Sequence, residues 1–143
     1  MEEKLYDSQN RALKAGGIVV HTNKQGLKKI LVLFRELTQD WTFPKGGIEG
    51  KELPEQTAIR EVKEETNIDT KVMKPLPPIE YYDDIKDEVV YQHMFLLEPL
   101  DFVTEEENDG DKVAWLSIEK TENRLTHGNL KEYFREFKEH ISI

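Results

Sequence analysis

A glycine-rich stretch that leads directly into an acidic helix constrains this chain more than any other feature. The stretch, WTFPKGGIEGKE, covers residues 41–52, and a helical pattern follows over residues 54–66, starting with a proline, which suits a first helical turn. Three apolar residues recur at the helical period: Ala58, Ile59 and Val62. Three carboxylates occupy the adjoining arc: Glu61, Glu64 and Glu65. We therefore predict a helix that packs against a core along one side and carries negative charge along the other.

The crowded carboxylates of this helix need a compensating positive charge. Glu61 and Glu65 lie one turn apart, and like charges at that spacing cost an isolated helix roughly 0.2–0.5 kcal/mol. Without the glycines, a solvated helix face with Arg60 and Glu64 as an ordinary pair would be the more common interpretation. The glycines allow backbone to approach a phosphate, and oxygen ligands at this spacing suit Mg²⁺, which completes its coordination with water and phosphate oxygens. The combination favours a magnesium site that binds a phosphorylated ligand.

Composition limits the remaining possibilities. The 143 residues correspond to one ordinary domain, and 20 basic against 29 acidic side chains leave a net charge of −9. Such a charge argues against binding duplex nucleic acid, whereas metal ions can bridge an acidic protein to an anionic small molecule. The chain has no cysteine and no apolar run long enough to span a bilayer, and its first residues contain no export signal. We expect a soluble, cytoplasmic protein that is not associated with a membrane.

The rest of the chain reads as strands interleaved with helices. Apolar runs over 15–21 and 29–35, separated by a turn, predict a hairpin. Further strands are predicted over 68–73, 78–83, 88–98 and 113–118, with KPLPP (74–78) as a turn and 104–111 as a solvated loop. A last amphipathic helix, over 129–141, carries four apolar residues on one side: Leu130, Phe134, Phe137 and Ile141. The predicted fold class is α/β, with a mixed sheet covered on both faces.

Other phosphate-binding and metal-binding motifs do not match. A P-loop ending at Gly50 and Lys51 would need glycine at position 45, which is lysine, and serine or threonine at position 52, which is glutamate. The dinucleotide pattern G-x-G-x-x-G is absent from this stretch, and the four histidines lack paired metal-binding spacing. We interpret the histidines as surface or packing residues.

Residues 46–68, GGIEGKELPEQTAIREVKEETNI, resemble the Nudix hydrolase motif G-x5-E-x7-R-E-U-x-E-E-x-G-U, in which U is a bulky aliphatic residue. Eight of its nine specified positions agree, from Gly46 through Glu52 and the Arg60–Glu61 pair to Ile68. The departure is Asn67, where the motif has glycine. Asparagine is the non-glycine residue that most readily adopts the left-handed conformation at a helix end, so we expect the site to stay intact.

The resemblance implies a single Nudix domain over 1–143, with an α/β/α sandwich around a mixed sheet. It also implies Mg²⁺- or Mn²⁺-dependent, MutT-like hydrolysis of a nucleoside diphosphate linked to another group. The implied metal ligands are Glu61, Glu64 and Glu65, joined by a backbone carbonyl of Lys45 or Gly46. Members differ in the position of the base that activates water.

Within the motif, the resemblance makes Glu61 the leading candidate for the base, with Glu64 beside it, while Arg60 and Glu52 orient the carboxylates. Four carboxylates of the late loop are alternative bases: Glu105, Glu106, Glu107 and Asp109.

The sequence before the motif favours one class of substrate. W-x-F-P-K-G resembles the branch that cleaves diadenosine polyphosphates, in which a lysine at the place of Lys45 approaches the phosphates. Arg35 could add a second cation, because guanidinium groups suit phosphate oxygens. The other candidate substrate-binding residues are the glycines of the loop and two tyrosines on which a base could stack: Gly46, Gly47, Tyr81 and Tyr82.

Alternative functions remain open. The first is a house-cleaning pyrophosphatase for nucleoside triphosphates, deoxynucleoside triphosphates or oxidised dGTP; ADP-ribose and diphosphoinositol compounds are weaker options. A non-enzymatic alternative is a nucleotide-sensing module that kept the fold. Both a monomer and a homodimer are compatible with the sequence.

Overall fold

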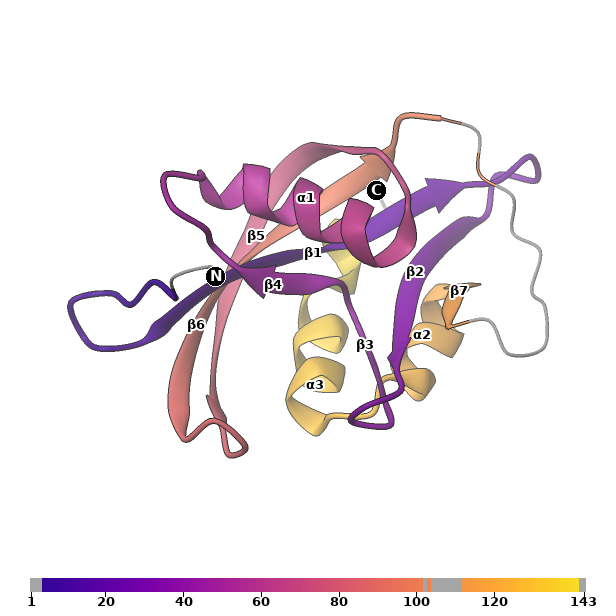
Figure 1. Ribbon diagram of the computed structural model, residues 1–143. Helices are drawn as coiled ribbons and strands as arrows, with labels where there is room; N and C mark the ends of the chain where they lie inside the picture. Colours follow the sequence, from indigo (N-terminus) through magenta and orange to yellow (C-terminus); the bar gives the residue numbers. More distant parts are fainter. Residues whose placement is uncertain (1–3, 102, 104–111, 142–143) are drawn as a thin grey trace.

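The computed structural model describes residues 4–101, 103 and 112–141, which form one mixed sheet with helices on both faces (Figure 1). The sheet has the strand order β3-β2-β1-β6-β5, with β4 paired to β1 and β7 paired to β2. The strands are β1 (Ala12–Thr22), β2 (Lys28–Arg35), β3 (Asp40–Thr42), β4 (Lys45–Gly47), β5 (Thr70–Asp83), β6 (Glu88–Pro99) and β7 (Val113–Leu116). The helices are α1 (Pro54–Thr66), α2 (Ile118–Arg124), α3 (Gly128–Phe137) and the 3₁₀ turn η1 (Lys138–His140).

β1 lies at the centre of the sheet. It pairs antiparallel with β2, which confirms the predicted hairpin, and parallel with β6 from Ala12 opposite Val90 to Val19 opposite Leu97. The short strand β4 also pairs with β1, with Gly46 opposite Ala15. This last pairing places the glycine-rich loop directly beside the central strand.

Two hydrophobic cores, one on each face of the sheet, produce the layered architecture. Successive residues of a strand point to opposite faces. Ala15 and Val19 of β1 therefore pack with Val62 of α1, whereas Ile18 packs on the other face with Phe134 of α3. The α/β/α arrangement expected from the sequence is confirmed, with α1 on one face and α2 and α3 on the other (Figure 1).

The predicted turn at KPLPP is wrong, because residues 70–83 form one continuous strand, β5. Two shifts of register interrupt its pairing with β6, between Val72 and Lys74 and between Leu76 and Ile79. β5 is the edge strand of the sheet, where proline is tolerated because only one side of the strand needs backbone donors. The prolines therefore mark an irregular edge rather than a change of direction.

The C-terminal part contains one helix more than the sequence predicted. α2 begins after Ser117, whose side chain accepts a hydrogen bond from the backbone N–H of Lys120. The predicted last helix is confirmed as α3, although it ends at Phe137 and continues as the turn η1. Leu130, Phe134 and Ile141 are buried, as expected. No helix in the described ranges is long and apolar enough to cross a membrane.

Candidate functional site

α1 forms where the sequence predicted it, and local signals explain both of its ends. At its start, the side chain of Gln56 accepts a hydrogen bond from the backbone N–H of Leu53 at 2.8 Å, and Pro54 occupies the first turn. At its end, Asn67 adopts the left-handed conformation, with φ 61° and ψ 24°, and its N–H donates to the carbonyl of Lys63 at 2.8 Å. The expected role of Asn67 as a substitute for glycine is confirmed.

Gly46 makes room for the carboxylate of Glu61. A Cβ atom on Gly46 would lie 2.0 Å from the Cδ atom of Glu61, a distance that real side chains do not tolerate. We expected the glycines to let backbone approach a phosphate, whereas this glycine lets the helix α1 bring its carboxylate against β4. The residues that the motif separates by fourteen positions are therefore in direct contact.

Arg60 is the hub of the first cluster of the site. Its Nε donates to Glu52 at 2.7 Å, one Nη donates to Glu61 at 2.8 Å, and the other donates to the carbonyl of Gly47 at 2.9 Å. Weaker contacts of 3.2 Å reach Glu64 and Glu49. The hydrogen bond from Arg60 lowers the pKa of Glu52 to about 2. The structure thus brings Arg60, Glu52, Glu61 and Glu64 together, while the catalytic roles that the resemblance implies for them stay predictions.

Glu65 is in a different environment from the carboxylates that Arg60 contacts. It is half-buried beside β4, where the backbone N–H of Lys45 donates to its Oε2 at 3.2 Å. Burial, together with the negative charge of Glu61, raises the pKa of Glu65 to about 8. A positive charge placed between Glu61 and Glu65 would offset this repulsion.

The donor set suits a hard divalent cation, although the side chains do not form a ready metal cluster. In the part of the chain that the structure describes, no three acidic or histidine side chains are gathered closely enough to hold a metal ion. Arg60 contacts both Glu61 and Glu64. The carboxylate oxygens of Glu61, Glu64 and Glu65 are nevertheless the ligand type that Mg²⁺ and Mn²⁺ prefer. The raised pKa of Glu65 shows that, among the described residues, negative charge at this place is not fully balanced by a nearby positive charge.

A second cluster surrounds the side chain of Lys45. Its Nζ donates to the hydroxyl of Tyr81 at 2.5 Å and lies 4.5 Å from the centre of that ring, and the hydroxyl donates to Gln92 at 3.3 Å. Burial, and then the positive charges of Lys14 and Arg35, lower the pKa of Lys45 to about 7. The backbone of Lys45 contacts Glu65 while its side chain contacts Tyr81. Lys45 therefore links the carboxylates of α1 to the second cluster.

Arg35 extends the second cluster through an ion pair with the buried carboxylate of Asp40, a contact that the sequence analysis missed. Its Nε donates to Asp40 at 2.9 Å across the turn between β2 and β3, and Asp40 also contacts Nε2 of His127 at 2.6 Å. Opposite charges on either side of a four-residue turn could have indicated the first contact. Similarly, Gln92 shares the inward alternation of Val90 and Met94, which marks it as a buried polar residue with a partner.

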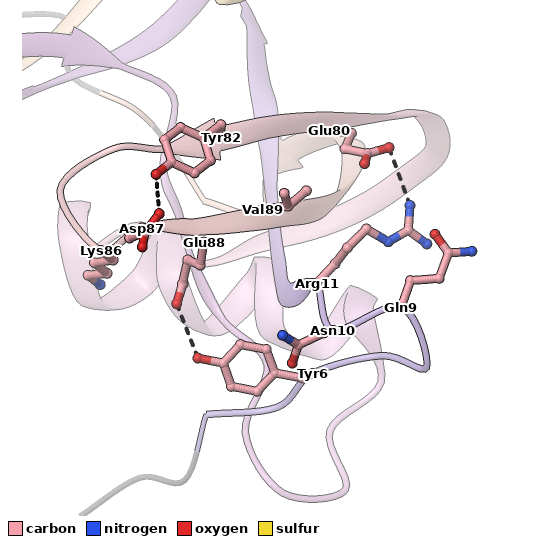
Figure 2. Close-up of a pocket in the computed structure, with 10 residues that line it drawn as sticks. All are labelled: Tyr6, Gln9, Asn10, Arg11, Glu80, Tyr82, Lys86, Asp87, Glu88 and Val89. Carbon is pink, nitrogen blue, oxygen red and sulfur yellow. Dashed lines mark hydrogen bonds and ion pairs between the residues drawn. The ribbon is translucent and has the colours of Figure 1, made fainter.

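Tyr82 lies apart from this cluster. Neighbouring residues on a strand point to opposite faces, so Tyr81 reaches Lys45 while Tyr82 stays 58% exposed and contacts Asp87. Tyr82 lines a cavity of about 550 Å³ between the β5–β6 hairpin and the N-terminal segment. Figure 2 shows the residues that line it. Elsewhere in its wall, Tyr6 donates a hydrogen bond to Glu88 and Arg11 donates one to Glu80. The alternative bases Glu105, Glu106, Glu107 and Asp109 lie outside the described residues.

Comparison with known proteins places the chain in a family. The sequence pattern of the NUDIX domain matches residues 11–137. A Mycobacterium tuberculosis protein that carries the name MutT4 is 37% identical over 92 residues, which are 62% of this chain and 37% of that protein. The m7GpppN-mRNA hydrolase of Saccharomyces cerevisiae is 29% identical over 110 residues, 76% of this chain and 11% of that enzyme. The chain therefore spans less than half the length of either relative.

Solved structures show the same fold. An Ap4A hydrolase of C. elegans superposes with a TM-score of 0.74 at 20% identity, covering 92% of this chain and 98% of that one. The Nudix hydrolase RenU of M. smegmatis superposes with a TM-score of 0.72 at 13% identity, covering 98% and 96%. At these identities the likeness concerns the fold. Because the NUDIX pattern matches nearly the whole chain, from residue 11 to residue 137, this protein belongs to the NUDIX domain family.

Proposed function

We propose that the protein is a metal-dependent pyrophosphohydrolase, an enzyme that cleaves a phosphoric anhydride bond in a nucleoside diphosphate linked to another group. The observation that carries this proposal is the contact of Glu61 with both Arg60 and Gly46. This contact holds the Glu61 carboxylate between the guanidinium group of Arg60 and the backbone of Gly46. The second carboxylate beside it is Glu65, whose pKa is raised to about 8. An ordered acid–base group next to uncompensated negative charge suits activation of water by a carboxylate with help from a bound cation.

Each residue of the first cluster has a role in this proposal. Glu61, Glu64 and Glu65 would hold Mg²⁺ or Mn²⁺, together with a backbone carbonyl of Lys45 or Gly46. When bound, the ion would lower the pKa of water and neutralise charge on the leaving phosphate. Glu61 accepts the proton of the attacking water, and Arg60 with Glu52 keeps the Glu61 carboxylate in one orientation.

The second cluster would hold the phosphates and the base. Lys45 and Arg35 supply positive charge, while Gly46 and Gly47 allow backbone to approach the phosphates. Tyr81, whose ring lies 4.5 Å from the Nζ of Lys45, supplies an aromatic face. We propose diadenosine polyphosphates as substrate, supported by W-x-F-P-K-G and by the fold shared with an Ap4A hydrolase. We further infer that the enzyme works in the cytoplasm, in accord with its lack of cysteine.

Hydrolysis of damaged or surplus nucleoside triphosphates is the second candidate. The MutT4 relative supports it, since that protein shares 37% identity over the matched region. The complete Arg60 network disfavours a nucleotide sensor, because a protein that only binds needs no oriented carboxylate at the position of Glu61.

Product analysis distinguishes these functions. The protein is incubated with Mg²⁺ and, separately, with diadenosine polyphosphates, deoxynucleoside triphosphates, oxidised dGTP and ADP-ribose, and the products are identified. Diadenosine tetraphosphate should turn over fastest and release ATP and AMP. Fastest turnover of a nucleoside triphosphate to a monophosphate and pyrophosphate would select the second candidate. Tight binding without turnover of any compound would contradict the proposed enzyme.

A further inference from the structure

Arg35 is held more firmly than a surface arginine. It ends β2, and its partner Asp40 begins β3, so the two residues face each other across a four-residue turn. Asp40 accepts hydrogen bonds from both Nε and Nη2 of Arg35. An arginine bonded through one edge of its guanidinium group keeps a fixed plane, and the group then points in one direction.

Asp40 has further partners that fix its own position. Its carboxylate accepts a hydrogen bond from the hydroxyl of Thr38 at 2.6 Å and lies 2.6 Å from Nε2 of His127. The residue is only 2% exposed. Although burial opposes ionisation, the hydrogen bonds from Arg35, Thr38 and His127 hold the pKa of Asp40 below its usual range. The carboxylate is therefore ionised and fully engaged.

The third partner connects this group to the C-terminal layer. His127 precedes the first turn of α3, and its neighbour Thr126 exchanges hydrogen bonds with the backbone of Trp41, at 2.8 and 3.2 Å. α3 itself is anchored in the core by Phe134. Asp40 is thus supported from β3, from the β2–β3 turn and from the loop before α3.

The fixed guanidinium group keeps the N–H donors of Nη1 for another molecule. Among the described residues, no hydrogen bond uses Nη1 of Arg35. The strand pairing brings Arg35 close to the site, because Leu33, two residues before Arg35, pairs with Thr42, three residues before Lys45. A donor group held in one plane on the same side of the site as the half-buried Lys45 suits a phosphate oxygen, which a mobile arginine would bind with a larger loss of entropy.

We propose that Asp40, supported by His127, is a positioning residue that holds Arg35 so that its Nη1 binds a phosphate of the substrate. This inference rests on the proposed function for the identity of the substrate. Its prediction that Arg35 and Asp40 affect nucleotide binding does not require that the protein hydrolyses the nucleotide. Stabilisation of the turn is the simpler role for the ion pair, and a buried ion pair is by itself weak evidence for stability. The two roles differ in what they predict for nucleotide affinity.

A double-mutant cycle separates them. The affinity of a non-hydrolysable, methylene-bridged ATP analogue is measured by calorimetry with Mg²⁺ for wild type, Arg35→Gln, Asp40→Asn and the double variant. Each single variant should weaken binding by about tenfold, and the double variant should be no weaker than Arg35→Gln. Losses that multiply in the double variant, or unchanged affinity of Asp40→Asn, would overturn the inference.

His127 provides a variant that does not place a change in the core, since its side chain is 51% exposed. His127→Ala should weaken binding by about threefold, and His127→Gln, whose amide can donate to Asp40, should restore it. A matched control is Glu122→Gln, which removes an ion pair with Arg135 between α2 and α3 and should leave affinity unchanged. Equal affinity of His127→Ala and wild type would argue against the support from α3.

Steady-state kinetics complete the test. With the substrate that wild type hydrolyses, Asp40→Asn should raise KM by about tenfold and change kcat by less than about threefold. If wild type hydrolyses no substrate, but the variants weaken binding of the ATP analogue as the double-mutant cycle predicts, the proposed function fails and the positioning role stands. If wild type hydrolyses its substrate while Asp40→Asn keeps the wild-type KM and only melts earlier, the positioning role fails alone.

Discussion

The carboxylate of Glu61 occupies the space that a side chain on Gly46 would need, with only 2.0 Å between that Cβ position and the Cδ atom of Glu61. The glycine at the start of the motif thus allows α1 to bring Glu61 against β4, in addition to the role proposed for it in phosphate binding. The contact explains why a glycine and a glutamate far apart in the motif must occur together.

Gly46→Ala should disable the enzyme without unfolding it. The added methyl group would displace the Glu61 carboxylate, and a shift of about 1 Å in a catalytic group costs about a hundredfold in rate. Turnover and melting temperature are measured together. Gly47→Ala is the matched comparison for kcat, since a Cβ atom there meets nothing within 4 Å and the proposed role of Gly47 in phosphate binding would be reported by KM. Equal losses in the two variants would show that the space beside Glu61 is not what matters.

Glu61→Gln should remove most of the turnover while the protein keeps its fold. Loss of a general base typically costs about 10²–10⁴-fold in rate. Glu64→Gln and Glu65→Gln should instead raise the metal concentration needed for half-maximal activity. Glu55→Gln, an exposed change on the same helix, serves as control. Near wild-type turnover of Glu61→Gln would transfer the role of base to another carboxylate.

Divalent metal should stabilise the folded protein. A ligand that binds only the folded state at about a hundred times its dissociation constant adds about 2.7 kcal/mol to the free energy of unfolding. The melting temperature is recorded with Mg²⁺ and with NaCl of the same ionic strength, which controls for screening. The Glu61→Gln, Glu65→Gln double variant should lose the response to Mg²⁺. A full response in that variant would place the ion elsewhere.

Stability at low pH should depend on Glu52. Because Arg60 lowers the pKa of this carboxyl from 4.5 to about 2, the ionised form stabilises the folded protein fully above pH 4.5. This contribution is lost as the pH falls from 4.5 through about 2. The free energy of unfolding of Glu52→Gln should therefore fall less steeply over this range in urea titrations. Parallel curves for the variant and wild type would contradict the ion pair.

The two neighbouring tyrosines should differ in their effect on the enzyme. Tyr81→Phe removes the hydroxyl that contacts Lys45 and should raise KM by about three- to tenfold, the net value of one typical hydrogen bond. Tyr82→Phe removes a contact with Asp87 on the other face and should leave KM unchanged. A larger effect of Tyr82→Phe would place the substrate in the cavity of Figure 2.

Local signals were sufficient for much of the fold. The bounds of α1 and the conformation of Asn67 depend on residues within one turn of the helix, so the sequence predicted them correctly. The turn expected at KPLPP was wrong because the tolerance for proline depends on β5 being an edge strand. The position of a strand in its sheet depends on pairing with distant residues, which a local pattern does not contain.

The sequence alone determined the family of the protein and predicted that Arg60, Glu61, Glu64 and Glu65 lie on one side of a single helix. Only the tertiary structure decided what meets across the chain. It brought His127 to Asp40, 87 residues away, and directed Tyr81 rather than Tyr82 toward Lys45. The physical reason is that helical periodicity is a local property, whereas contacts between strands and loops depend on how the sheet and its two cores assemble.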